Sequence, residues 1–282
     1  MIKVVSWNIA KREKPWRELV EMDADVALVQ EAGSPPGDLI DLVDYEDGVF
    51  WDRHLYDRWP LVLKLSDRVE VEWFKQVAPI CDLGSDAIGV SGIGTIAAAK
   101  VVPVACHDKA FIAVSMYARW LRPHPSVKTN WSVGYSDASA HRIISDLSAF
   151  IGSRDPSTHR ILAAGDLNMI YGAIGYKLSL PERERTVWDR FQALGLEFIG
   201  PQWPDACRQA SSQPTDVPGD TKNVPTFYSL GGSPETALNQ LDYAFASRGF
   251  HESVKVRALN EIDNDKWGSS DHCRLLIEVD CG

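Results

Sequence analysis

Short apolar segments rich in β-branched residues recur along the whole chain, and many of them alternate apolar with polar positions. Such alternation is typical of strands that bury one face. The segments cover residues 3–9, 26–30, 49–51, 61–65, 69–74, 95–102, 110–117, 160–164, 242–246, 254–258 and 274–279. Many strands with few helices and no internal repeat predict two packed sheets flanked by helices.

Three segments fit helices instead, over residues 16–22, 139–151 and 181–194. The second has an apolar stripe at helical spacing, formed by Ile143, Ile144, Leu147 and Phe150. A stripe of this kind packs on a sheet. The pattern is therefore that of an α/β protein.

Two long segments, 119–135 and 200–225, follow neither pattern and are rich in proline and tryptophan. Loops of this length in a compact domain are more often functional than filler. Neither has the composition of a linker between domains, and 282 residues fit one domain. We expect a single domain over residues 1–282.

The composition narrows the class of protein. With 45% hydrophobic and 24% charged residues, the chain is typical of a soluble globular protein. No apolar run approaches the ~18 residues that cross a bilayer, and the N-terminus enters a strand without the pattern of a leader. The five cysteines form no Cys-x-x-Cys pair, which favours reduced thiols. The sequence predicts a cytoplasmic protein without a membrane span.

Short acidic or amide motifs stand at the ends of five apolar runs. In chain order they are Ser6-Trp7-Asn8, Gln30-Glu31, Gly165-Asp166-Leu167-Asn168, Leu241-Asp242-Tyr243 and Ser270-Asp271-His272. Polar groups at strand ends converge on one edge of a sheet, where ligands bind. The five motifs in this order resemble the endonuclease/exonuclease/phosphatase family, over roughly residues 2–279. The resemblance implies a four-layered αββα sandwich of two mainly antiparallel sheets, and a metal-dependent phosphoesterase.

Phosphoester hydrolysis needs a divalent cation, a base for the attacking water and a proton source for the leaving oxygen. By the resemblance, Glu31 is the main metal ligand, Asn8 lies beside the metal and Asp271 is a nearby carboxylate. Hard Mg²⁺ prefers carboxylate and water oxygens. We therefore expect Mg²⁺ as the cofactor, with Mn²⁺ able to substitute.

The resemblance also implies catalytic roles. Asp242 and His272 match an Asp-His dyad, in which the carboxylate fixes the tautomer and supports positive charge on the ring. His272 would then address either a phosphate oxygen or the water. Asp166 and Asn168 stand two apart, so in extended chain they point the same way. Asp166 would orient or deprotonate the water, Asn168 would donate to a phosphate oxygen, and Tyr117 at the end of the central strand can also donate there.

Two positions depart from the family patterns. Most phosphatases and DNase I-like members have a histidine where Tyr117 aligns, whereas apurinic endonucleases have a tyrosine followed three residues later by an asparagine. Here that second place is Trp120. Apurinic endonucleases also carry an acid two residues after the Asn8 position, where this chain has Ala10. We expect one well-held metal ion rather than two.

The loop after Tyr117 supplies the candidates for substrate binding. Arg119 and Arg122 are expected to hold phosphate groups, and Trp120 and Trp131 to stack on a base or ring. The net charge of −10 argues against loose binding of long nucleic acid, which depends on lysine and arginine neutralising phosphates. We therefore favour a phosphodiester or phosphomonoester of a small molecule or short nucleic acid as the substrate. The alternatives are an apurinic or single-strand endonuclease or exonuclease acting on DNA, and a catalytically silent binding module.

Overall fold

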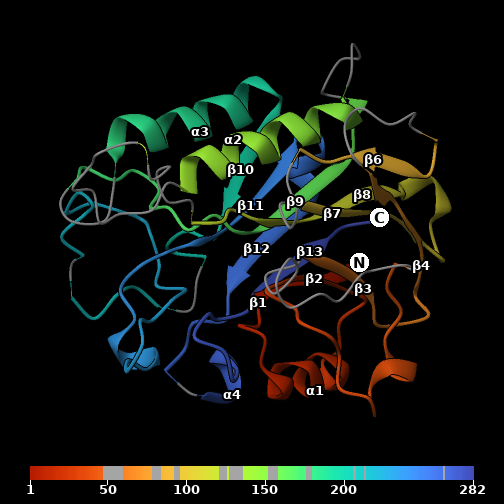
Figure 1. The fold of residues 1–282 in the computed structure, drawn as a ribbon, viewed down its shortest axis with the longest axis horizontal. Helices are drawn as coiled ribbons and strands as arrows, with labels where there is room; N and C mark the ends of the chain where they lie inside the picture. The colour runs from red at the N-terminus through yellow and green to blue at the C-terminus, as the bar shows by residue number, and fades with distance from the viewer. Residues whose placement is uncertain are drawn as a thin grey trace.

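The computed structural model describes residues 1–46, 60–77, 84–91, 96–120, 126, 136–151, 158–175, 180–205, 208–212, 214–262 and 264–282. Two sheets pack face to face at its centre (Figure 1). The first has the order β12 (Val254–Ala258), β13 (Leu275–Val279), β1 (Ile2–Asn8), β2 (Val26–Gln30) and β3 (Leu61–Lys64). The second has the order β10 (Leu196–Gly200), β11 (Asp242–Ser247), β9 (Ile161–Asp166), β8 (Phe111–Tyr117), β7 (Ile96–Pro103) and β4 (Val69–Trp73).

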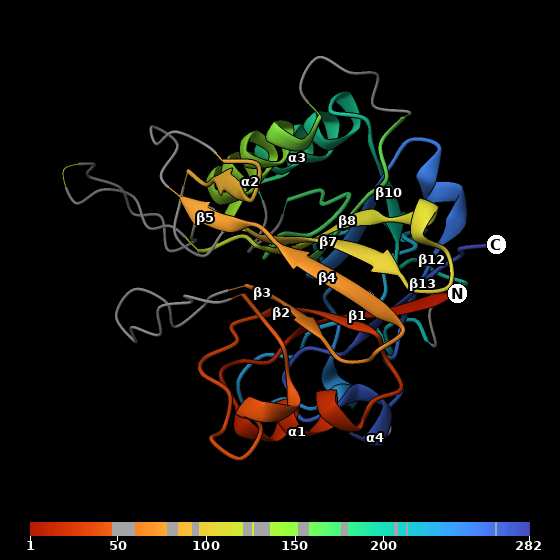
Figure 2. The ribbon, with the colours of Figure 1, turned by 90° about the vertical axis from the view of Figure 1, so that its right-hand side faces the viewer.

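Helices cover the outer faces of both sheets. Figures 1 and 2 show α2 (Ser136–Leu147) and α3 (Pro181–Ala193) over the second sheet, and α1 (Glu13–Glu21) and α4 (Asn264–Trp267) beyond the first. Single 3₁₀ turns lie at Ile40–Leu42, His107–Lys109, Ser148–Phe150, Pro234–Thr236 and Phe250–Ser253. A short parallel pair, β5 (Lys75–Val77) and β6 (Ala87–Gly89), forms a separate sheet. The four layers, helix, sheet, sheet and helix, are the αββα sandwich that the sequence predicts.

Three apolar layers hold the sandwich together. Between the sheets, small and branched side chains such as Val4, Leu28 and Ala164 pack fully buried. Outside the second sheet, the predicted stripe of α2 packs with α3 on the strands. Outside the first sheet, Trp16 and Leu19 of α1 cover β1 and β2. Burial of apolar surface in these layers is the main stabilising contribution.

The mainly antiparallel sheets contain two parallel pairs, β1 with β2 and β8 with β9. Strands β5, β6 and β10 and helix α4 were not expected from the sequence. β10 follows α3 after only a few residues, so its pattern merges with that of the helix, and the others are three or four residues long. The strand expected at 49–51 lies outside the described residues. None of the described helices has the length and apolar character to cross a membrane.

Candidate active site

The two-residue period of the strands sets which motif side chains meet. Ala164 of β9 lies in the core between the sheets, so Asp166, two residues further on, faces the same gap. The same alternation puts four more strand-end side chains in the gap: Asn8, Gln30, Tyr117 and Asp242. In the ladders, Asp166 is opposite Tyr117 on one side and opposite Asp242 on the other. Three adjacent strands therefore present their terminal polar groups side by side.

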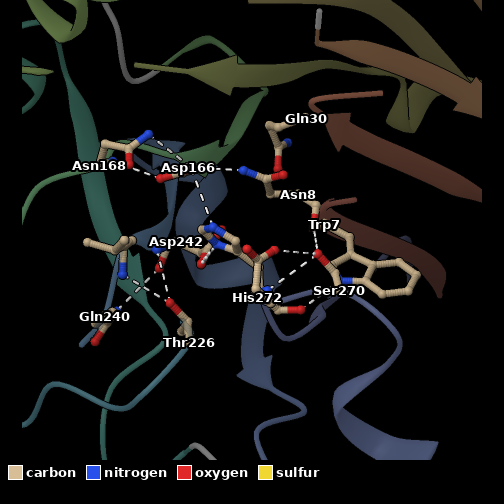
Figure 3. Close-up of polar contacts among 12 residues, drawn as sticks. Trp7, Asn8, Gln30, Asp166, Asn168, Thr226, Gln240, Asp242, Ser270 and His272 are labelled. Carbon is tan, nitrogen blue, oxygen red and sulfur yellow. Dashed lines mark hydrogen bonds and ion pairs between the residues drawn. The ribbon is translucent and has the colours of Figure 1, made fainter. Parts of the chain in front are cut away.

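His272 completes an ion pair inside this gap. Its Nδ1 lies 2.9 Å from Asp242 Oδ2, and both side chains are buried (Figure 3). The Asp242 backbone N–H donates to Thr226 Oγ1. The centroid of the Phe227 ring lies 4.8 Å from that of the imidazole. Burial by itself lowers the pKa of His272, but the charges of Asp242 and Asp166 outweigh that effect and raise this pKa to about 10. The imidazole is therefore a cation at neutral pH.

Asp166 is buried and surrounded by hydrogen-bond donors. Its Oδ1 accepts from the Asn168 backbone N–H at 2.7 Å, and its Oδ2 accepts from the side-chain amides of Asn8 and Asn168, each at 3.0 Å (Figure 3). His272 Nε2 lies 3.9 Å from the same Oδ2. Burial raises the pKa of Asp166 to about 7, while the His272 charge acts in the opposite direction. A carboxylate with this pKa can accept a proton near neutral pH.

Glu31 directly follows β2, is half-buried and is a candidate ligand for a divalent cation. Its Oε1 accepts from the Tyr117 hydroxyl at 3.0 Å and lies 3.5 Å from the Asn8 side-chain amide nitrogen. Within the described chain no hydrogen-bond donor contacts Oε2, so this oxygen could bind a metal ion. Carboxylate oxygens are the hard ligands that Mg²⁺ prefers. The Asn8 oxygen instead accepts from the Ala10 N–H. As placed, Asn8 turns its amide nitrogen, not its oxygen, toward the two carboxylates.

Asp271 stands apart from the most compact group of ligand atoms. In the described part of the chain, one set of three such atoms lies within 4.8 Å of one another, from Asp166, Asp242 and His272. A metal ion in that set would have to displace the proton that Asp242 and Asp166 hold on His272. Asp271 is partly exposed, accepts from Ser270 Oγ and lies beside Arg12.

Trp120 and Asn168 form a contact that the motifs alone do not indicate. The Trp120 indole N–H donates to Asn168 Oδ1 at 2.8 Å, and the Asn168 amide nitrogen donates to the Ala118 carbonyl and to Asp166. Both amide hydrogens of Asn168 are thus used within the protein. The Trp120 ring stays 43% exposed beside them. The Arg119 backbone N–H donates to Ser139 Oγ, whereas Arg122 and Trp131 lie outside the described residues.

Gln30 joins the two sheets next to the site. Its buried side-chain amide donates to Ser115 Oγ of β8 at 2.9 Å, and Ser115 Oγ donates back to the Val29 carbonyl. Ser115 precedes Tyr117 by two residues, and Gln30 precedes Glu31 by one. The hydrogen bond between Gln30 and Ser115 therefore holds together the strand ends that carry Tyr117 and Glu31. A polar residue on the inward face of an apolar strand is the signal that could have identified Ser115.

Two further side chains hold the last motif to the first. Ser270 Oγ donates to the Asn8 carbonyl at 2.6 Å, and the Trp7 indole N–H donates to the His272 carbonyl at 2.9 Å (Figure 3). Both contacts are buried and span more than 260 residues of sequence. They fix the backbone that carries His272 against the end of β1.

Comparison with known proteins gives the same fold. The sequence model of the endonuclease/exonuclease/phosphatase family matches residues 5–272. The AP endonuclease LMAP from Leishmania major superposes with a TM-score of 0.63 at 17% identity, over 99% of this chain and 88% of that one. The catalytic domain of Xenopus laevis APE2 gives 0.61 at 16%, over 99% and 91%. The 3′ phosphatase NExo (D146N) from Neisseria, bound to a product DNA hairpin, gives 0.56 at 14%, over 99% and 100%. No curated protein sequence matches the chain.

Proposed function

We propose that this chain, which belongs to the endonuclease/exonuclease/phosphatase family, hydrolyses a phosphodiester of DNA with the help of a divalent cation. The observation that carries the proposal is the buried array of Asp166, His272 and Asp242 at the strand ends, with Glu31 beside it. A base, a fixed cation and a free carboxylate oxygen thus lie around one gap. These groups supply the base and the metal ligand that in-line attack of water on phosphorus requires.

Asp166 serves as the base in this proposal and His272 as the cation. With a pKa of about 10, His272 keeps its proton at neutral pH and cannot accept one from water. With a pKa of about 7, Asp166 can. The His272 ring donates to a phosphate oxygen, and Asp242 holds the ring in place through Nδ1. Tyr117, Asn8 and Asn168 act as positioning residues, because their hydrogen bonds end on Glu31 or Asp166.

Glu31 would hold the divalent cation, with water molecules as most of the remaining ligands. When bound there, Mg²⁺ or Mn²⁺ polarises the phosphoryl oxygens and offsets the charge that develops on them. Tyr117 and Asn8 orient the carboxylate by addressing Oε1. Asp271 belongs to the same side of the site through its link to Ser270, whose hydroxyl donates to the Asn8 carbonyl.

DNA is the proposed substrate class because the structural neighbours include AP endonucleases and a phosphatase bound to a DNA hairpin. Trp120 supports it, since an exposed ring beside the site can stack on a base or sugar. A small phosphate ester is the second candidate, favoured by the net charge of −10. Arg119 and Arg122 would contact phosphate in either case, and Trp131 would stack on a base or ring.

The test is a substrate panel with and without chelator. Duplex DNA with an apurinic site, single-stranded DNA and a chromogenic phosphodiester are incubated with Mg²⁺, with Mn²⁺ or with EDTA. His272→Ala, purified identically, reports any contaminating nuclease. Metal-dependent cleavage of DNA that His272→Ala lacks supports the proposal. Faster turnover of the chromogenic ester than of DNA would favour the small substrate. No turnover of any ester would favour the catalytically silent binding module.

A further inference from the structure

The turn between β1 and α1 fixes an arginine at the edge of the site. The Lys11 backbone N–H donates to the Glu31 carbonyl at 2.8 Å, and the Arg12 N–H donates to the Ile9 carbonyl at 3.0 Å. Ala10 and Lys11 adopt left-handed conformations, with φ of 50° and 58°. These bonds tie the turn to the ends of β1 and β2. Arg12 therefore has a defined backbone position next to Glu31.

The Arg12 side chain reaches across to the last motif. Its Nη1 donates to the Ser269 carbonyl at 2.9 Å, and its Nη2 lies 3.8 Å from Asp271 Oδ2. The Ser269 contact sets the direction of the guanidinium N–H, because N–H···O angles above about 150° are preferred. Asp271 thus has a permanent positive neighbour supplied by the chain itself.

We propose that Arg12 serves as a fixed counter-cation for Asp271, so that the site takes one divalent cation at Glu31 instead of two. A second ion on Asp271 would lie about 2.0–2.6 Å from its oxygens, and therefore within a few ångströms of the guanidinium, where like charges repel strongly. Ala10, two residues after Asn8, has no side-chain atom that could help to hold such an ion. The inference rests on the proposed metal-dependent hydrolysis and deepens it.

Metal stoichiometry tests the inference without reference to turnover. Mn²⁺ binding to the full chain is measured by titration calorimetry and by the electron paramagnetic resonance signal of free Mn²⁺. Wild type should bind one ion. Arg12→Ala should bind a second Mn²⁺ ion, at least tenfold more tightly than any second ion binds to wild type. Arg12→Lys should bind one ion, because it keeps the positive charge.

Arg17→Ala is the matched control. Arg17 lies in the adjoining helix, is exposed to a similar extent (47% against 44%) and pairs with Asp38, away from the site. Arg17→Ala should bind one Mn²⁺ ion, as wild type does. Circular dichroism confirms that each variant is folded.

The outcomes separate this inference from the function itself. Two ions in wild type, or one ion with unchanged affinity in Arg12→Ala, would overturn the role of Arg12 and leave metal-dependent hydrolysis standing. No ion in wild type, together with hydrolysis that EDTA does not affect, would overturn both. One ion in wild type and in Arg17→Ala, with a second in Arg12→Ala, supports the inference.

Discussion

Replacing Asp242 by asparagine should move the pH range of activity toward acid. In the proposed mechanism, activity requires ionised Asp166 and protonated His272. It should therefore rise as pH increases through about 7 and fall as pH increases through about 10. The Asp242 charge is the largest of the effects that raise the pKa of His272, and it also raises the pKa of Asp166. Its removal lowers both values.

The size of the change follows from the two pKa values of the imidazole. If the pKa of His272 falls from about 10 to its ordinary 6.5, the cation loses on the order of 5 kcal/mol of stabilisation. In the variant the Asp166 and Asp271 charges still raise this pKa and burial still lowers it, so the ordinary value serves as the reference. With a pKa of 6.5, only about 1% of the rings are protonated at pH 8.5. Activity should then fall ~100-fold relative to wild type at pH 8.5, and far less at pH 6.

The assay is the rate at saturating substrate and metal between pH 5 and pH 10.5. A histidine Cε1–H NMR titration gives the pKa of His272 independently. Asp271→Asn is the control, because the Asp271 charge contributes less than that of Asp242 to the pKa of His272, and its alkaline limb should move less. His272→Ala should cost about 10²-fold to 10⁴-fold, and adding Asp242→Asn should cost little more. An alkaline limb at the same pH in Asp242→Asn and wild type would refute the reasoning.

Three further changes probe the neighbouring groups. Glu31→Gln should raise the Mg²⁺ concentration needed for half-maximal rate at least tenfold, because an amide replaces the charged ligand; an unchanged metal titration contradicts the assignment of Glu31. Ser115→Ala should lower the free energy of unfolding by about 1–3 kcal/mol, since the buried Gln30 amide loses an acceptor, and a urea midpoint equal to that of wild type would exclude this link. Trp120→Ala should weaken DNA binding by roughly 1–3 kcal/mol through the loss of stacking. Trp120→Phe keeps a ring without the N–H and should lose less binding free energy. Equal losses in both variants would assign the effect to the hydrogen bond with Asn168 instead of stacking.

Strand periodicity and the motif order predicted much of the fold and the meeting of the motifs. Because alternation along a strand is strict, a buried Ala164 determines which way Asp166 faces, and the pairing of Asp242 with His272 could be expected in advance. The sequence could not indicate that Asn168 uses both amide hydrogens inside the protein. That orientation depends on the Trp120 N–H, which comes from a different strand end and donates to the Asn168 side-chain oxygen. It also could not indicate the orientation of the Asn8 amide, which depends on the turn at Ala10.

The backbone at Glu31 explains why periodicity alone would have misplaced the proposed metal ligand. Gln30 faces the gap between the sheets, so continued alternation would turn residue 31 to the opposite face. Glu31 instead adopts a left-handed conformation, with φ of 47°, and its carboxylate meets the Tyr117 hydroxyl in the gap. Asn168 has φ of 50° where it leaves β9. Glu31 and Asn168, together with Ala10 and Lys11 in the turn after β1, are the non-glycine residues with positive φ in the described chain. Such conformations cost of order 1–3 kcal/mol each and persist only where the surroundings enforce them. Here the three buried layers stabilise the strands, and the turns at their ends take up the strain that directs the polar groups toward one another.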